Sequence, residues 1–322
     1  MRHRVIMVLA IVTVLLGGVM LVPAAYTRLT GGDALASIGS IGGIGGGEKV
    51  PAPAPTPPPP PTLADAPVSV SFKGEFFSWA LMDRKTGEIS GAKNMTSTNS
   101  TESMIKAWFA SDYLHQLGDK PLSAERKRQI DTAIRDSNDD AANALYKANG
   151  SAKSITRMIK TCGLTDTKPG TVPGYVGWWS FTQMSPQDAV RLGDCVADGK
   201  AAGTKWTKFV LDEMAKVRGT VKDQQQRSGG GHWGIIDGLP ESITSQGPVS
   251  IKNGWTPLNY DGNWHVNCLA VTDKWSLAVM MRYPQKAGLE YGAKVCASVA
   301  TQLVTPQPGA ALKVPQQPVG KL

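Results

Sequence analysis

The apolar positions of this chain repeat with two different spacings, one typical of strands and one typical of helices. Apolar, β-branched and aromatic residues are concentrated in short segments near residue 80 and again after residue 249. The first two of these segments can pair as a hairpin, because the four residues at 84–87 (RKTG) are typical of a turn. Strands are predicted at 75–83, 88–93, 249–251, 265–272 and 275–283.

Between these strands the apolar residues recur at helical spacing. The segment after residue 102 follows this pattern, so Ser103 falls in the first turn of a predicted helix. The clearest helix start is Ser185, which precedes Pro186 and is followed three residues later by Asp188. Helices are predicted at 103–117, 123–136, 139–148, 151–162, 186–199, 203–217 and 288–303.

The order of these elements predicts the class of fold. Two strands, a helical middle, three strands and a closing helix indicate an α+β domain, with an antiparallel sheet packed with helices plus a helical subdomain. This domain is assigned to 68–305, a length that can bury its own core.

The N-terminal segment predicts export. Residues 5–22 form an apolar run without a charge, and Arg2 and Arg4 precede it. Such a run is typical of an export signal or of a membrane anchor whose N-terminus stays inside, and it is assigned to 1–28. We favour an uncleaved anchor, although small residues offer a cleavage site. No cysteine lies near the end of the run, which argues against a lipoprotein anchor.

Two further segments are too poor in large apolar residues to build a core. Residues 29–67 are rich in Gly, Ser, Ala and Pro and end in a proline tract at 57–61. They are expected to form a flexible linker that becomes a stiffer spacer. Residues 306–322 are rich in Pro and Gln and are expected to be a disordered tail.

All four cysteines lie within the predicted domain, and an even number in an exported chain favours two disulfides over a metal site. Three pairings are possible. We choose Cys162–Cys195 and Cys268–Cys296, because the first pair lies in the helical middle and the second in the C-terminal strand and helix.

The net charge of +8 is dispersed along the chain, without a basic block or interleaved aromatic residues. Solubility explains this charge better than nucleic-acid binding does. No nucleic-acid partner and no cofactor are expected, and the oligomeric state stays open.

Three short motifs follow one another along the chain. The first matches S-x-x-K, and the second and third are variants of S-D-N and K-T-G. Ser90 begins another S-x-x-K match, but it lies in a predicted strand, where its lysine points to the opposite face. The helical spacing of Ser103 and Lys106 instead puts hydroxyl and amine on one face. The motifs are Ser103-Met104-Ile105-Lys106, Ser137-Asn138-Asp139 and Lys252-Asn253-Gly254.

The motifs, their order and the order of elements resemble the serine β-lactamase/penicillin-binding protein family, and in particular its class A β-lactamase-like domain. The resemblance covers residues 70–304. It implies an acyl-enzyme on Ser103, with Lys106 as the base that takes the hydroxyl proton. It also implies that Lys252 is a second cation that holds a substrate carboxylate, and that Ser137 relays a proton to the leaving nitrogen.

The resemblance assigns the substrate contacts to Asp139, Asn253, Gly254 and Trp255. The backbone N–H groups of Trp255 and Ser103 would hold the oxyanion. The substrate would be a peptidoglycan-type compound or a β-lactam.

Three departures from the family pattern limit this chemistry. Asp139 replaces an asparagine, and a carboxylate near Lys106 favours the ammonium form; a small shift of the turn would bring Asn138 or Asp140 there instead. Asn253 replaces a hydroxyl residue, so its amide can bind a carboxylate but cannot relay a proton. The glutamate that activates the deacylating water in class A β-lactamases is missing between Cys162 and Ser185, where Asp166 is the only carboxylate.

Three functions stay open on these grounds. The first is an exported serine acyl-enzyme with weak or no β-lactam hydrolysis. The second is an inactive domain that binds an envelope ligand or protein, and the third is a hydrolase with another base, such as an esterase. Six aromatic residues near the predicted loop and sheet edge are explained by core packing or by an apolar cleft. They are Tyr175, Trp178, Trp179, Trp233, Trp255 and Trp264.

Overall fold

The computed structural model describes residues 68–225 and 229–304. At their centre is an antiparallel sheet with the strand order β2-β1-β8-β7-β5, and β6 also pairs with β7. Every pairing in it is antiparallel. The strands are β1 (Phe76–Asp83), β2 (Ile89–Gly91), β5 (Ser250–Ile251), β6 (Gly254–Leu258), β7 (Asn263–Val271) and β8 (Trp275–Pro284).

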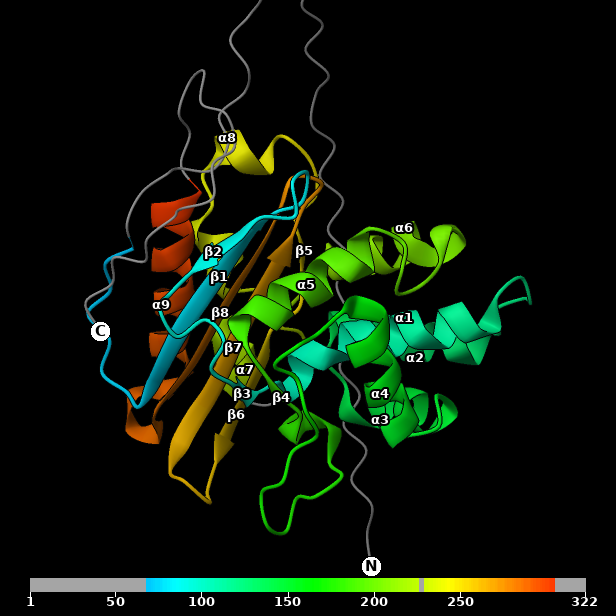
Figure 1. The fold of residues 1–322 in the computed structure, drawn as a ribbon, viewed down its shortest axis with the longest axis horizontal. Helices are drawn as coiled ribbons and strands as arrows, with labels where there is room; N and C mark the ends of the chain where they lie inside the picture. Colours follow the sequence, from blue (N-terminus) through cyan, green and yellow to red (C-terminus); the bar gives the residue numbers. More distant parts are fainter. Residues whose placement is uncertain (1–67, 226–228, 305–322) are drawn as a thin grey trace, which may run out of the picture. The chain divides into compact units, whose positions relative to one another are not determined.

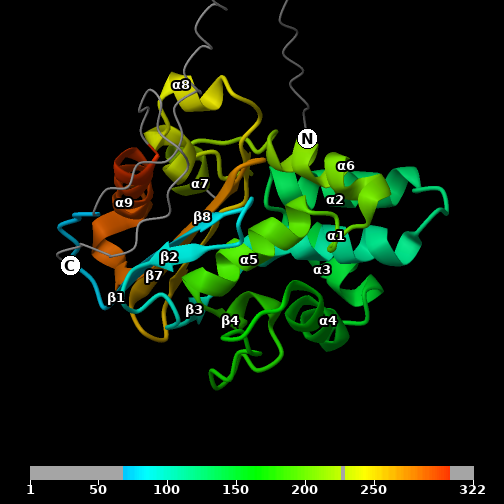
Figure 2. The same ribbon diagram turned by 45° about the horizontal axis from the view of Figure 1, so that its top comes forward.

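Helices cover both faces of the sheet (Figures 1 and 2). Helix α9 (Gly288–Leu303) lies on one face, and α5 (Pro186–Ala197) lies across the other. The remaining long helices pack beyond α5 as a helical subdomain. They are α1 (Lys106–Leu117), α2 (Ala124–Arg135), α3 (Asp139–Ala148), α4 (Ala152–Cys162) and α6 (Thr204–Met214).

Shorter elements connect these layers. Strands β3 (Asn99–Ser100) and β4 (Gln183–Met184) pair with each other beside the start of α1. The short helices are α7 (Val221–Gln225) and α8 (Glu241–Thr244), with 3-10 turns at Glu102–Ile105, Trp179–Phe181, Gly234–Gly238 and Gln285–Ala287.

The sheet has a nearly continuous apolar sequence because both of its faces are covered. All eight residues of β1 are buried, and Trp79 and Phe77 are among the largest side chains that solvent does not reach. Burial of each such side chain contributes about 1.5 to 3 kcal/mol. The two covered faces explain why these strands read as apolar runs and not as alternating sequences.

The predicted α+β class is confirmed, and the main strands and helices lie close to the predicted ranges. Two details differ. The helix predicted at 103–117 begins as a 3-10 turn at Glu102–Ile105, and α1 starts only at Lys106. Strand β6 was not predicted, because it contains Pro257; a proline cannot donate to the ladder, and this strand tolerates it at the edge beyond β7.

Both predicted disulfides are confirmed. Cys162 at the end of α4 joins Cys195 in α5, with 5.4 Å between the Cα atoms. Cys268 in β7 joins Cys296 in α9, with a Cα separation of 6.4 Å. In the chain-entropy account, closing loops of this size stabilises the fold by about 3 to 4 kcal/mol each.

The predicted anchor at 1–28, linker at 29–67 and tail at 306–322 lie outside the described residues. Within residues 68–225 and 229–304, no helix has both the length and the apolar character needed to cross a membrane.

Candidate functional site

The first motif lies where the 3-10 turn passes into α1. Ser103 is half-buried in the turn, and Lys106 is fully buried at the first position of the helix. Glu102, directly before Ser103, has a φ of +48°. A residue with a side chain rarely occupies this left-handed region, and it persists only where the surroundings hold it in place. The surrounding residues therefore hold the backbone at Ser103 in a fixed conformation.

The third motif lies against this turn through Gly254. A Cβ atom at Gly254 would lie 2.5 Å from the carbonyl oxygen of Thr101 and 2.8 Å from the backbone nitrogen of Ser103. No real side chain tolerates such distances, so only glycine lets β6 approach the turn that carries Ser103. The predicted oxyanion donors, the N–H groups of Ser103 and Trp255, thus belong to two segments in close contact.

Ser137 connects the two lysines. Lys106 Nζ donates to the carbonyl oxygen of Ser137 at 2.5 Å and lies 3.4 Å from its hydroxyl. Lys252 Nζ donates to the same hydroxyl at 2.9 Å. Ser137 has a φ of +53°, which turns both its carbonyl and its hydroxyl toward the lysines. All three motifs therefore meet at one place.

Asp139 lies in direct contact with Lys106, while its expected contact with a substrate stays a prediction. Its carboxylate accepts a hydrogen bond from Lys106 Nζ at 2.6 Å, although three quarters of its side chain is exposed. The alternative with Asn138 at the site does not occur, because the Asn138 side chain caps α3 by accepting from Ala141 N at 2.8 Å.

Burial and charge act differently on the two lysines. Burial lowers the pKa of Lys106, while the Asp139 carboxylate and, more weakly, Glu102 oppose this shift. Burial also lowers the pKa of Lys252 to well below its ordinary value, and the charge of Lys106 adds to the effect. Within the described parts of the chain, Lys252 donates to oxygens of Ser137 and Asn253. Among the described residues, Lys106 has a carboxylate in contact and Lys252 does not. The ammonium form is therefore more favourable for Lys106, and Lys252 becomes a free amine more readily.

Asn253 does not direct its amide group at the lysines. Its Nδ2 donates to the carbonyl oxygens of Gly231 at 2.9 Å and of Trp233 at 2.7 Å. Both N–H bonds of this buried amide are thus used within the protein. Its expected contact with a substrate carboxylate stays a prediction, and it would require one of these bonds to exchange.

Aromatic rings lie beside both amines. Lys106 Nζ is 5.3 Å from the Trp179 ring centroid, and Lys252 Nζ is 5.8 Å from that of Trp255. Trp233 packs edge-on against Trp255 at 5.4 Å. Such rings attract cations and exclude water. Trp264 lies elsewhere, with its indole N–H bonded to the carbonyl of Gln285.

The remaining predicted aromatic residues form a separate cluster. Tyr175 stacks on Phe181 at 4.4 Å and contacts Trp178 and Tyr260. Trp178 and Tyr260 are exposed, at 59% and 44%. Core packing therefore does not explain every aromatic residue of the loop.

The structure places Asp166 away from the lysines. Its carboxylate accepts from the Ser185 hydroxyl at 3.1 Å, and its backbone N–H donates to the buried Asp188 at 2.7 Å. Asp166 therefore anchors the loop to the start of α5. This arrangement agrees with the expectation that it cannot replace the missing glutamate.

A row of buried polar residues next to the turn that carries Ser103 was not predicted. It contains Ser100, Glu102 and His265, and ends at Asp261. Burial raises the pKa of the Glu102 carboxyl to about 7. One signal was available: Glu102 is a carboxylate directly before Ser103, at the start of a predicted buried or half-buried helix.

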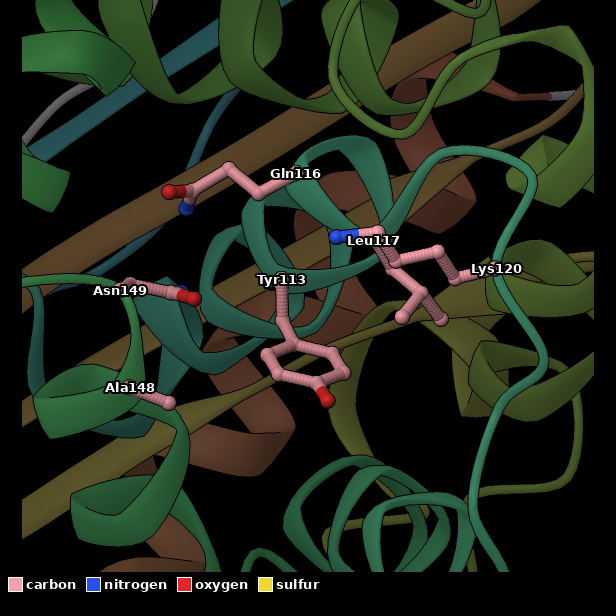
Figure 3. Close-up of a pocket in the computed structure, with 6 residues that line it drawn as sticks. All are labelled: Tyr113, Gln116, Leu117, Lys120, Ala148 and Asn149. Atoms are coloured by element: carbon pink, nitrogen blue, oxygen red, sulfur yellow. The ribbon is translucent and has the colours of Figure 1, made fainter.

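Two other features do not belong to this site. A shallow pocket in the helical subdomain lies between the end of α1 and the end of α3, and no motif residue lines it (Figure 3). Within the described parts of the chain, no group of His, Cys, Asp and Glu residues could hold a metal ion. The pocket is lined by Tyr113, Gln116, Leu117, Lys120, Ala148 and Asn149.

Comparison with solved structures decides the fold. A β-lactamase from Xanthomonas campestris superimposes with a TM-score of 0.54 at 15% identity, over 71% of this chain and 91% of that chain. A β-lactamase from Desulfarculus baarsii gives a TM-score of 0.53 at 14% identity, over 71% and 90%. An ancestral class A β-lactamase gives 0.53 at 15%, over 71% and 94%. The chain has a β-lactamase-like fold. Similarity at these identities concerns the fold alone.

The sequence comparisons add a second kind of relative. No protein-family model matches the chain. It is 28% identical over 186 residues to "Putative lipoprotein LppW" of Mycobacterium bovis and of Mycobacterium tuberculosis. The match covers 56% of this chain and 54% of the relative, so it spans about half the length of these curated proteins.

Proposed function

We propose that the chain is an exported β-lactamase-like serine acyl-enzyme that reacts through Ser103 and hydrolyses β-lactams weakly or not at all. The observation that carries the proposal is the contact of Ser137 with Lys106 and Lys252, in a site that Gly254 brings against Ser103. Four residues whose side chains suit acyl transfer, two serines and two lysines, are thus gathered from three distant segments.

In the proposed reaction, the Ser103 hydroxyl attacks a carbonyl carbon, and its proton passes to a neutral lysine amine. The developing oxyanion accepts from the N–H groups of Ser103 and Trp255. The proton then moves through the Ser137 hydroxyl to the leaving nitrogen as its bond to the carbonyl breaks. Lys106 is the base in the family pattern. In a second route, Lys252 takes the proton and the Ser137 hydroxyl relays it. This route is favoured because Asp139 stabilises the ammonium form of Lys106.

The proposal limits turnover for two reasons. Asp139 favours the ammonium form of Lys106 and so opposes the effect of burial, which slows the removal of the serine proton. The loop before α5 contains no glutamate, and Asp166 is bonded at the helix start. A chain that acylates but deacylates slowly behaves as a penicillin-binding protein, so peptidoglycan-type amides or β-lactams are the proposed substrates.

We place the protein in the cell envelope. The apolar run at 5–22 supports export, and the related LppW is named as a lipoprotein. This chain would be held differently, because all four of its cysteines are in disulfides and none is free for a lipid.

A second candidate is an inactive domain that binds an envelope ligand in the same site. The Lys106–Asp139 ion pair and the internal amide bonds of Asn253 favour it, since both groups are already satisfied within the protein.

Intact-mass measurement separates these two functions. The full chain is incubated with a penicillin and with an activated ester; a covalent adduct is expected on the wild type and on Ser90→Ala, and none on Ser103→Ala. Ser90 is a matched control, because it begins the other S-x-x-K sequence and is also buried. No adduct with either compound after long incubation supports the binding function.

A further inference from the structure

Behind the nucleophile, four polar side chains form a continuous row of close contacts. Glu102 Oε1 and Ser100 Oγ are 2.6 Å apart, and Ser100 Oγ is 2.6 Å from His265 Nδ1. His265 Nε2 lies 2.7 Å from Asp261 Oδ2. Glu102, Ser100 and His265 are almost fully shielded from solvent, whereas the Asp261 side chain is 20% exposed. The row thus runs from the turn that carries Ser103 toward the surface.

The contacts restrict where the protons lie. With Asp261 ionised, an ionised Glu102 accepts from the Ser100 hydroxyl, so Ser100 must accept from His265 Nδ1–H, and Nε2–H faces Asp261. His265 is then an imidazolium. If Glu102 is protonated, it donates to Ser100, Ser100 donates to Nδ1, and a neutral His265 donates through Nε2–H to Asp261.

These two arrangements contain the same number of protons. They interconvert when the Glu102 proton moves to Ser100 Oγ while the Ser100 proton moves to His265 Nδ1. An arrangement with one proton fewer would leave two lone pairs facing each other at 2.6 or 2.7 Å. The geometry therefore requires one shared proton, which can lie at either end of the row.

We propose that Glu102, Ser100, His265 and Asp261 form a proton-holding chain that sets the charge behind Lys106. When the shared proton is on His265, Glu102 is an anion and stabilises the Lys106 ammonium. When it is on Glu102, that stabilisation is lost and Lys106 more readily becomes a free amine. Glu102 and His265 are positioning residues here, and their effect on acylation rests on the proposed function.

The charged surroundings agree with a proton shared in this way. The pKa of Glu102 is raised to about 7, mainly by burial and in part by the charge of Asp139, against the lowering effect of the Ser100 and Thr256 hydroxyls and of the Lys106 charge. Burial lowers the pKa of His265. Contributions to the His265 shift also come from Asp261 and Glu75, which raise its pKa, and from Arg282, which lowers it; the Tyr260 ring lies 6.1 Å from the imidazole.

The backbone around the chain is fixed on both sides. Asn267 in β7 donates to the Ser100 carbonyl at 2.8 Å, and Asn99 donates to Asn267 Oδ1 at 3.0 Å. His265 is the β7 partner of Thr256 in β6, the strand that also carries Gly254. The four side chains are therefore held in place when the charge of Glu102 or His265 changes. The change of charge then acts on the proton affinity of neighbouring groups.

The test is an NMR titration of the histidine rings in the full chain. In Glu102→Gln the negative charge near His265 is gone, and the introduced amide can donate to Ser100, which keeps His265 neutral. The His265 midpoint is expected to fall by about 1 pH unit or more relative to the wild type. Ser100→Ala removes the bridge and should also lower the midpoint, so it replaces Glu102→Gln if that variant does not fold. His115, exposed in the last turn of α1, is the internal control.

An unchanged His265 midpoint in both variants would overturn the proton-holding chain. The link to Lys106 is tested by the rate of adduct formation against pH, whose rising limb should move to lower pH in Glu102→Gln and stay in place in His115→Gln. An unmoved limb in Glu102→Gln overturns that link. If the wild type forms no adduct, the proposed function fails, and the His265 titration still decides the proton chain.

Discussion

Lys106 has a carboxylate on each side, and the two carboxylates differ in every respect that matters for electrostatics. Asp139 contacts Lys106 Nζ directly at 2.6 Å, but its side chain is 75% exposed. Glu102, directly before Ser103, is shielded from solvent and acts on Lys106 through its charge without a direct hydrogen bond to it. The front carboxylate is largely exposed to solvent, whereas the rear one is buried with a raised pKa and can take up a proton.

This difference indicates which carboxyl group should control the rate of acylation and which should control the pH dependence of stability. An exposed carboxylate in contact with an amine changes the proton affinity of that amine and contributes little to stability. A buried carboxyl costs more, and its ionisation is coupled to its buried partners. Asp139 should therefore govern the rate of acylation, and Glu102 should govern the pH dependence of stability.

The largest effect is expected from the rear carboxyl. The folded-state pKa of Glu102 is raised to about 7 from an ordinary 4.5, so the folded protein binds this proton more tightly than the unfolded chain. Its stabilising contribution is complete below pH 4.5 and is lost as the pH rises through 7, by about 3 kcal/mol in total. Urea unfolding at several pH values should show the wild type losing stability relative to Glu102→Gln over this range. His265 acts in the opposite direction, because its lowered pKa removes stability as the pH falls.

The control is the front carboxylate. The difference in unfolding free energy between the wild type and Asp139→Asn should change by less than about 1 kcal/mol over the same pH range. A larger change for Asp139→Asn than for Glu102→Gln would reverse the assigned roles.

An intermediate effect is expected on the rate of acylation. In Asp139→Asn the carboxylate in contact with Lys106 is lost, so the pKa of the lysine falls and more free amine is present at neutral pH. Adduct formation should become about 10-fold faster or more, and its rising limb should move to lower pH by about 1 unit. Intact-mass spectra of samples quenched at successive times measure this rate.

Asp212→Asn is the matched control, because Asp212 forms an equally short ion pair with Lys208 on an exposed face of α6. Its rate should equal that of the wild type. A slower reaction in Asp139→Asn would refute the account in which the carboxylate restrains Lys106.

Much of the front of the site could be predicted from the sequence. Motif spacing and helical periodicity place Ser103 and Lys106 within one turn, and the direct Lys106–Asp139 contact follows from the second motif. Gly254 was predicted as a motif residue, but its reason is visible only in three dimensions, where a Cβ would overlap the turn that carries Ser103.

The rear of the site could not be predicted in the same way. Ser100, Asp261 and His265 are not part of any motif, and they come together only because β7 contacts β3 and the turn that carries Ser103. Strand β6 was hidden by Pro257. Because β6 was not predicted, the sequence did not indicate that His265 pairs with Thr256.

The smallest effect is expected from Trp179, the aromatic residue beside Lys106. Trp179 faces Lys106 at 5.3 Å and donates its indole N–H to Asn143 Oδ1 at 2.8 Å. Trp179→Phe keeps a ring but weakens its attraction for a cation, by about 0.5 to 1 kcal/mol. The Lys106 ammonium is then less favoured, so acylation should become about 2- to 5-fold faster, less than in Asp139→Asn. Trp206→Phe is the matched control, because Trp206 also faces a lysine and also donates its indole N–H. A Trp179→Phe effect larger than that of Asp139→Asn would mean that water exclusion by the ring, and not the carboxylate, sets the proton affinity of Lys106.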